Sequence, residues 1–341
     1  MIDLVRYEGA AIWLYRRLKT ANVINMLPGD FRETLRDRAL DDTSRRLDVE
    51  AEAGAVLALL NTAGIPVILL KGLARCALAA RYPYLDARST IDVDLLVSRD
   101  RIDDADRVLR ADGYRPALPD GEEYPGHHHL PPLCKGPITV ELHSSTSARA
   151  TAEVAWQRAN DGAETLSWGN QLVRVPSPTE LAWHAIVHAM EDGVYGFRLT
   201  RFLEVAALVA SDAPIDWTVI RERSATNEAR DPETNARDQQ AVVLAWLNAA
   251  FTLVDPARRP PGFEKPVFTL TRLLQWRLSV LPIRPRVGPE ISGHLLQEGP
   301  RAMLHLPLRA SPANASWLGK MRRPLAGTAA RLAYGLWRLG K

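Results

Sequence analysis

Cysteine is scarce in this sequence, and long apolar runs are missing. The chain of 341 residues has two cysteines, Cys76 and Cys134, too few for a disulfide scaffold and consistent with a reducing compartment. No stretch reaches the roughly 18 uninterrupted apolar residues that a membrane span requires. The opening residues, MIDLVRYEGAAIWLYRRLK, lack the apolar core of a signal peptide. These absences predict a cytoplasmic protein.

An excess of charge of one sign is also missing, and so is lysine. The 43 basic residues nearly balance the 40 acidic ones, giving a formal net charge of +3, so the composition indicates no global polyanion-binding surface. Only six of the basic residues are lysines, which makes each lysine more informative. Hydrophobic content of 46% is ordinary for a globular chain that buries one large core or two smaller ones.

The hydrophobic pattern predicts strands alternating with helices, followed by helices alone. We expect strands over 65–70, 91–97, 138–143 and 171–175, and helices over 1–20, 41–63, 73–80, 100–111, 179–191, 198–210, 216–224, 236–254 and 266–280. Residues 115–136, rich in proline, glycine and histidine, are expected to form a loop. The predicted organisation is a helical segment (1–40), an α/β domain (41–176), a helical domain (177–300) and a basic tail (301–341).

Two aspartates interrupt the apolar strand around residue 92. Asp92 and Asp94 lie in IDVDLLV, and Glu141 and His143 lie in the later stretch ITVELH. Residues two apart share one face of a strand, so three carboxylates converge if these strands are neighbours. Many D-x-D pairs are turn or cap residues, but this pair is in mid-strand. Repulsion among the acids favours a divalent cation, Mg²⁺ or Mn²⁺, with phosphate oxygens completing its shell.

Lys71-Gly72 lies at a predicted strand-to-helix junction. A glycine there lets a ligand approach the backbone, and a helix N-terminus favours an anion. The Lys71 ammonium adds a point charge suited to phosphate. The alternative is a tight turn with a solvated lysine, but the nearby acids favour a phosphate site.

The motifs follow the order L-K-G, R-x-x-x-D-x-D-L-L-V, a His-Pro loop and E-L-H. They stand at Leu70–Gly72, Arg88–Val97, His128/His129 and Glu141–His143. This order resembles the uncharacterised nucleotidyltransferase family of the polymerase-β superfamily, and the resemblance extends loosely to about residue 210. It implies an α+β fold, with a small mixed-sheet palm, flanking helices and a mainly helical C-terminal region. It also implies that Asp92, Asp94 and Glu141 bind metal and act in catalysis.

The turn departs from the general superfamily pattern. Ordinary members carry Gly-Ser there, where the serine hydroxyl meets the nucleotide phosphate, whereas this chain has Lys71-Gly72 followed by Leu73. We therefore expect the donor phosphates to be bound by Lys71 and Gly72, together with Ser89 and Arg88.

Histidines supply the remaining polar candidates on the α/β side. His127-His128-His129 precedes Cys134 and His143, but this spacing fits no common tetrahedral zinc motif. We expect His128, His129 and His143 to contact the acceptor or relay a proton. The alternative for His128 and His129 is a solvated loop, and the alternative for His143 is a buried histidine whose hydrogen bonds are satisfied within the fold.

On the predicted helices that follow, His184 and His188 share one face at i, i+4. We interpret them as packing or acceptor-side residues, because the H-E-x-x-H form of a zinc site is missing. Arg198 and Arg201 are expected to be solvated, with phosphate contact as the alternative.

The tail after residue 300 carries basic residues and apolar residues at helical spacing. A basic amphipathic helix over 317–341 can dock on an anionic membrane surface or on a partner, and it can equally pack on its own domain. Nucleic acid binding has weaker support, because a single basic tail is thin evidence for it.

Together these features predict a Mg²⁺-dependent nucleotidyltransferase that moves an NMP from an NTP, such as ATP, to a hydroxyl or phosphate acceptor. The acceptor could be a small molecule, a peptide or protein, or an RNA end. Two alternatives are a non-catalytic palm-fold scaffold and a kinase that transfers the γ-phosphate from the same metal site.

Overall fold

The structure is a computed structural model that describes residues 9–117, 127–191 and 199–226. It also describes residues 243, 244, 246–248, 250, 251, 258–260 and 263. The chain divides into two compact units, Met1–Gln297 and Glu298–Lys341, and all described residues belong to the first. The predicted helix over 266–280 and the basic tail over 301–341 lie outside the described residues, and the predicted helix over 236–254 lies largely outside them.

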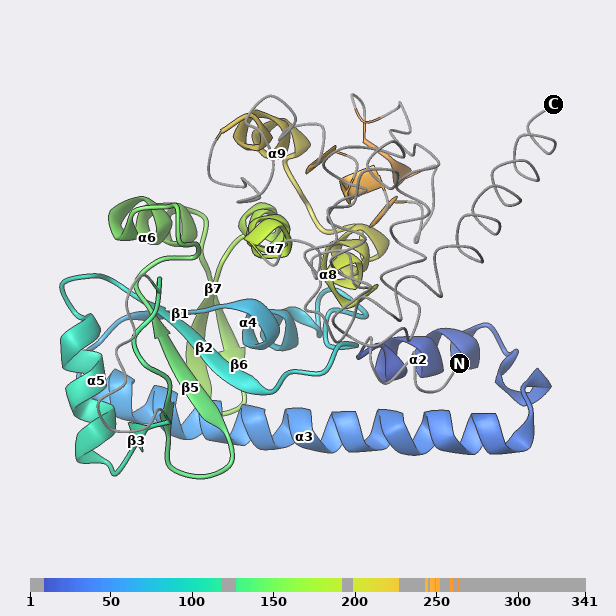
Figure 1. Cartoon of the computed structure of the whole chain (residues 1–341), viewed down its shortest axis with the longest axis horizontal. Coiled ribbons are helices and arrows are strands. Elements are labelled where there is room, and N and C mark those ends of the chain that lie inside the picture. Colours follow the sequence, from blue (N-terminus) through green and yellow to red (C-terminus); the bar gives the residue numbers. More distant parts are fainter. Residues whose placement is uncertain are drawn as a thin grey trace, which may run out of the picture. The chain divides into compact units, whose positions relative to one another are not determined.

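The described elements are a mixture of helices and strands up to β7 and are helices from α7 to α9 (Figure 1). They are α2 (Ala11–Thr20), the 3₁₀ helix η1 (Ile24–Met26), α3 (Gly29–Thr62), β1 (Val67–Leu69), α4 (Lys71–Leu78), β2 (Asp92–Val97), α5 (Ile102–Ala111), β3 (Arg115–Pro116), β4 (Leu133–Cys134) and β5 (Thr139–His143). They continue as α6 (Ala152–Asp161), β6 (Glu164–Trp168), β7 (Gln171–Val175), α7 (Pro178–Glu191), α8 (Leu199–Ala210) and α9 (Trp217–Ser224). No described helix is long and apolar enough to cross a membrane.

Five strands form one mixed sheet in the order β1-β2-β5-β4-β3. The central pair, β2 and β5, is parallel, whereas β1 pairs with β2, and β4 with β5 and β3, in antiparallel fashion. A separate hairpin is formed by β6 and β7. The predicted α+β fold with a small mixed sheet is therefore confirmed.

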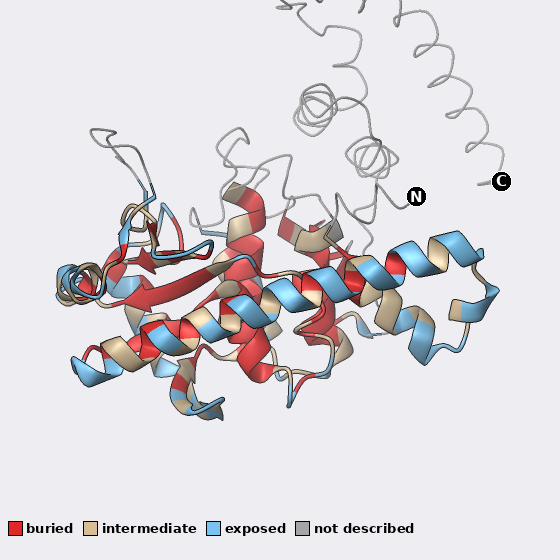
Figure 2. Cartoon of the chain, turned by 90° about the horizontal axis from the view of Figure 1, so that it is seen from below, coloured by how far each residue is buried: buried red, intermediate tan, exposed pale blue. Residues whose placement is uncertain are grey.

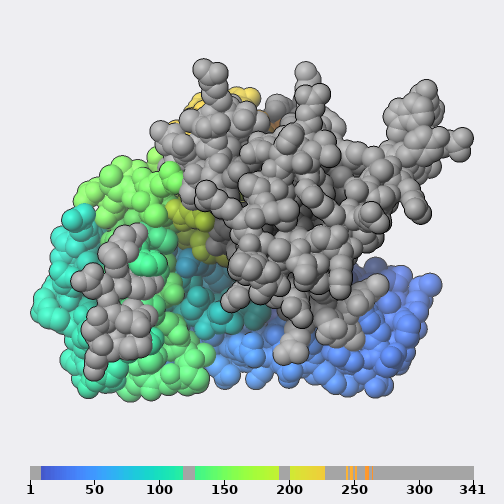
Figure 3. All heavy atoms as spheres, viewed as in Figure 1, coloured from blue at the N-terminus to red at the C-terminus, as the bar shows by residue number. Residues whose placement is uncertain are grey.

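The two faces of the sheet have different roles. On one face, Val93, Leu95 and Val97 join the main core with residues of α3 and α5, as the alternation of side chains along a strand dictates. Figure 2, seen from the α3 side, shows buried strands behind a helix whose outer surface is exposed. In the space-filling view α3 runs along one side of the described chain (Figure 3). The opposite face of β2 carries Asp92 and Asp94.

Several element boundaries differ from the sequence-based prediction. Helix α3 begins at Gly29, well before the predicted start near residue 41. The prediction missed the first half of the helix because this half buries only a few residues, including Leu35 and Ala39, against α2. Such a sparse apolar stripe gives little periodic signal. Helix α6 was not predicted, although Thr151 caps it by accepting a hydrogen bond from the Val154 N–H.

The strands β3, β4 and β6 were not predicted either. The expected loop over 115–136 contains β3 and β4, each only two residues long. Strand β6, ETLSW, is half exposed and carries a glutamate, a threonine and a serine. Its apolar alternation is therefore weak, and pairing with β7 supplies the order that the sequence pattern does not show.

Candidate active site

Strands β2 and β5 bring the predicted acidic residues together. Asp94 lies directly opposite Glu141 in the parallel register, and Asp92 lies opposite Thr139. Opposite residues on adjacent strands point to the same face, so Asp92, Asp94, Glu141 and His143 share one side of the sheet. The expected adjacency of the two strands is confirmed.

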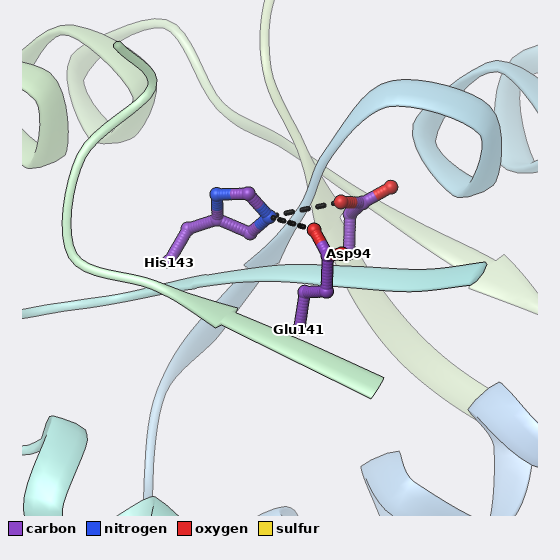
Figure 4. Close-up of side chains that lie close together, drawn as sticks. All are labelled: Asp94, Glu141 and His143. Atoms are coloured by element: carbon purple, nitrogen blue, oxygen red, sulfur yellow. Dashed lines mark hydrogen bonds and ion pairs between the residues drawn. The ribbon is translucent and has the colours of Figure 1, made fainter. Parts of the chain in front are cut away.

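A buried histidine joins the two facing acids (Figure 4). The Nε2 atom of His143 lies 2.8 Å from Oδ1 of Asp94 and 3.3 Å from Oε2 of Glu141. An ionised carboxylate only accepts hydrogen bonds, so Nε2 carries the proton and donates. Both His143 and Asp94 have 0% exposure, so this contact fixes the orientation of the Asp94 carboxylate.

Within the described part of the chain, Lys71 is the lysine that contacts these acids. Its Nζ lies 2.7 Å from Oδ1 of Asp94 and 3.6 Å from Oε2 of Glu141. Burial lowers the pKa of Lys71, but the charges of Asp94 and Glu141 outweigh burial and leave the pKa raised. Lys71 therefore remains an ammonium group. The alternative of a solvated turn lysine is wrong, because its side chain is only 19% exposed.

Lys71 also shapes the ionisation of the acids. Burial raises the pKa of Asp94, yet the Lys71 ammonium and the hydrogen bond from His143 hold it well below the usual value. The pKa of Glu141 is likewise lowered, because His143 and Lys71 outweigh the effect of burial. Burial and the neighbouring Asp94 charge raise the pKa of Asp92 to about 7. The acids on this face of the sheet therefore differ in direction of shift: the pKa of Asp92 is raised, whereas the pKa values of Asp94 and Glu141 are lowered.

The donor set suits a divalent cation. One oxygen of Asp94, Oδ2, is buried and has no hydrogen-bonding partner among the described residues, an arrangement that normally costs free energy. Polar atoms of Asp94, Glu141 and His143 lie within 4.8 Å of one another; because Nε2 of His143 carries its proton, the two carboxylates are the ligands that this group offers. Asp92 is not a member of this trio, although its charge interacts with Asp94. Carboxylate oxygens are the ligands that Mg²⁺ and Mn²⁺ prefer.

Gly72 is required by a contact that the sequence did not indicate. A Cβ atom at this position would lie 2.7 Å from Cγ2 and 2.9 Å from Cβ of Thr90, and it would also overlap Oγ1. Thr90 is buried in the segment that leads into β2. The glycine therefore permits this segment to pack on α4. Ser89, which precedes Thr90 in the segment, is half-buried.

Arg88 lies in an ion-pair network next to the acidic cluster. It pairs with the buried Glu204 of α8, which also faces Arg75 at 3.3 Å and Arg201 at 3.5 Å. The expectation that Arg201 is a solvated arginine is wrong for this reason, and Arg198 lies outside the described residues. Glu204 therefore links α8 to α4 and to the segment before β2 through these ion pairs.

The histidines of the loop approach the same face. His129 forms an antiparallel bridge with His143, and the rings of His128 and His129 lie 5.3 and 4.9 Å from that of His143. Burial, followed by the neighbouring imidazoles, lowers the pKa of His128 to about 3. Burial also lowers the pKa of His129, so the neutral form is favoured for both His128 and His129.

His184 and His188 lie on α7 and line a small pocket with Lys71, Arg75 and Glu204. Burial lowers both pKa values well below the usual one, and nearby cations add to the effect. The Nε2 atom of His184 has no hydrogen-bonding partner among the described residues. The prediction of packing or acceptor-side residues places them correctly on a helix but did not anticipate their closeness to Lys71.

Sequence reasoning missed three structural residues of this region: Arg75, Thr90 and Glu204. Arg75 follows Lys71 by one helical turn, so a polar side chain on the buried face of α4 was the available signal. Glu204 stands in the stretch 198–204 that loosely resembles the family, but neither it nor Thr90 could be given a role, because their partners are distant in sequence.

The small mixed sheet, with acids on two adjacent strands, is the arrangement that the resemblance to nucleotidyltransferases implies for their palm. The family described as uncharacterised nucleotidyltransferase matches residues 1–239. The chain belongs to this family of nucleotidyltransferase enzymes, so the resemblance seen in the sequence is confirmed.

Solved structures give weaker likenesses. The antibiotic-resistance factor ANT(2'')-Ia matches with 12% identity over 62% of this chain and 97% of its own, at a TM-score of 0.38. An antigenic nucleotidyltransferase-like protein from Paracoccidioides brasiliensis matches with 18% identity over 63% of this chain and 91% of its own, at a TM-score of 0.37. No curated protein matches.

Proposed function

We propose that this protein transfers a nucleoside monophosphate from an NTP to a hydroxyl or phosphate group of an acceptor, in a reaction that requires Mg²⁺ or Mn²⁺. The observation that carries the proposal is the Asp92, Asp94 and Glu141 cluster on two adjacent strands, in a chain of the nucleotidyltransferase family. Asp92 and Asp94 would hold the ion. When bound, the ion neutralises charge on the phosphate chain and polarises its oxygens.

The remaining steps belong to the residues of the chain. The acceptor oxygen attacks the α-phosphorus, the bond from that phosphorus to the bridging oxygen breaks, and pyrophosphate leaves. The proton of the acceptor passes to Glu141, whose lowered pKa keeps it ionised and which is half-buried at the edge of the cluster. His143 holds the acids in position, and Lys71 and the Gly72 N–H at the start of α4 face the donor phosphates. Positioning and charge neutralisation supply most of the rate.

The acceptor would be a small molecule, a peptide or protein, or an RNA end, and the histidines at 128 and 129 are placed to contact it. Each of these rings lies close to the ring of His143, on the acidic face of the sheet. In the neutral form that burial favours, they can accept a hydrogen bond from a hydroxyl group or donate one to a phosphate group.

Each α-³²P-labelled NTP, incubated with Mg²⁺ or Mn²⁺ and a cell lysate, tests the proposal. Label should move to an acceptor in the wild type and be lost in Asp92→Asn/Asp94→Asn. Asp112→Asn, which changes an exposed carboxylate paired with Lys135 at 2.8 Å, is the matched control and should retain transfer. Release of NDP in place of pyrophosphate would identify a γ-phosphate kinase. Neither product, together with no metal-dependent rise in melting temperature, would identify a scaffold.

A further inference from the structure

The Lys71 ammonium occupies the position of a cation between Asp94 and Glu141. Its Nζ lies 2.7 Å from an oxygen of Asp94 and 3.6 Å from an oxygen of Glu141. The Nε2 atom of His143 contacts the same two oxygens. A divalent ion that bridged these oxygens would have to lie about 2.0–2.6 Å from each. The ion and the ammonium group cannot both occupy that space.

The backbone holds Lys71 in this place. Its φ is +44°, a left-handed conformation that a residue with a Cβ rarely adopts and that persists only where the surroundings fix it. Leu70 N–H donates to the Asp94 carbonyl at 3.0 Å, which extends the pairing of β1 with β2 up to the lysine. Gly72, the residue after Lys71, packs closely against the side chain of Thr90. The start of α4 therefore directs the lysine toward the acids.

The two oxygens of Asp94 differ in their surroundings. Oδ1 accepts hydrogen bonds from Lys71 and His143, whereas Oδ2 is buried and has no partner among the described residues. Asp92 lies on the same face and feels the Asp94 charge. Oδ2 is thus the oxygen of Asp94 that is left for an ion, and Asp92 lies two residues away on the same face of β2.

Many enzymes that act on phosphate groups hold two divalent ions about 3.5–4 Å apart. We propose that Lys71 takes the place of one of these ions, so that the chain binds a single divalent ion at Asp92 and Asp94. The inference rests on the proposed function. Charge supports it, because one divalent ion together with the ammonium neutralises the three carboxylates of the cluster. A second ion would leave the cluster positive within a largely buried site, which is unfavourable.

Counting bound Mn²⁺ by electron paramagnetic resonance, in an equilibrium titration of the full chain, tests this inference. We expect one ion per chain in the wild type and in Lys71→Arg, which keeps a cation. We expect a second ion in Lys71→Met, because the oxygens of Asp94 and Glu141 are then released. Lys135→Met is the matched control, since Lys135 pairs only with the exposed Asp112 among the ion pairs of the described chain, and it should bind one ion.

Two bound ions in the wild type would overturn the inference while leaving the proposed function intact, and a single ion in Lys71→Met would do the same. Absence of Mn²⁺ binding in both proteins would overturn the inference together with the metal requirement of the proposed function. If Lys71→Met does not fold, the wild-type count decides alone, because one ion supports the inference and two refute it.

Discussion

Gly72→Ala tests the packing that positions the lysine. In most helices this substitution stabilises by about 0.5–1 kcal/mol, because alanine has the higher helix propensity. At position 72 the new methyl group would meet three side-chain atoms of Thr90, with Cγ2 at 2.7 Å and Cβ at 2.9 Å. Thr90 is only 4% exposed and cannot turn into solvent. Overpacking of this kind costs about 1–3 kcal/mol, so we expect net destabilisation of about 1–2 kcal/mol.

Gly54→Ala provides the matched comparison. Gly54 lies inside α3, and a Cβ there would meet nothing within 4 Å, so the substitution should stabilise by about 0.5–1 kcal/mol. Thermal unfolding followed by circular dichroism should therefore shift in opposite directions for the two variants. Thr90→Ala removes the two nearest atoms and should reduce the cost of Gly72→Ala in a double-mutant cycle. Equal stabilisation by both glycine substitutions would refute the steric argument.

Two further predictions concern the buried charges behind the site. Glu204→Gln removes the carboxylate that faces the buried Arg75 and should cost about 3–5 kcal/mol in urea unfolding; an unchanged midpoint would mean that the arginines do not depend on Glu204. Acidification should destabilise the chain through His184 and His188, whose folded pKa values lie well below the ordinary one. Because the unfolded chain takes up these protons first, stability is complete above about pH 6.5 and falls below it. Each histidine contributes up to about 1.4 kcal/mol per pH unit. His184→Phe should reduce the slope of unfolding free energy against pH, and an unaltered slope would contradict this origin.

The sequence by itself determined the candidate acids and the face on which each pair lies. Alternation along IDVDLLV places Asp92 and Asp94 together, and the same rule places Glu141 with His143. Repulsion among buried carboxylates then required a cation. The order of motifs was enough to identify the family, because it depends on spacing along the chain. Buried strands and compact amphipathic helices were also predictable, since each carries a local period.

Only the tertiary structure decided which residues meet. The alternation of side chains predicts which face of a strand a residue lies on, but it predicts neither the neighbouring strands nor their register. From the sequence, Asp94 and Glu141 were therefore expected to meet only if their strands were neighbours, as they are. The same holds for Lys71, because the sequence did not indicate that its side chain contacts both Asp94 and Glu141. Arg88 pairs with Glu204 of α8, and Thr90 packs against Gly72 of α4, in both cases a residue of another element. Contacts between distant segments are fixed by how the whole core packs, and a local pattern contains no information about that packing.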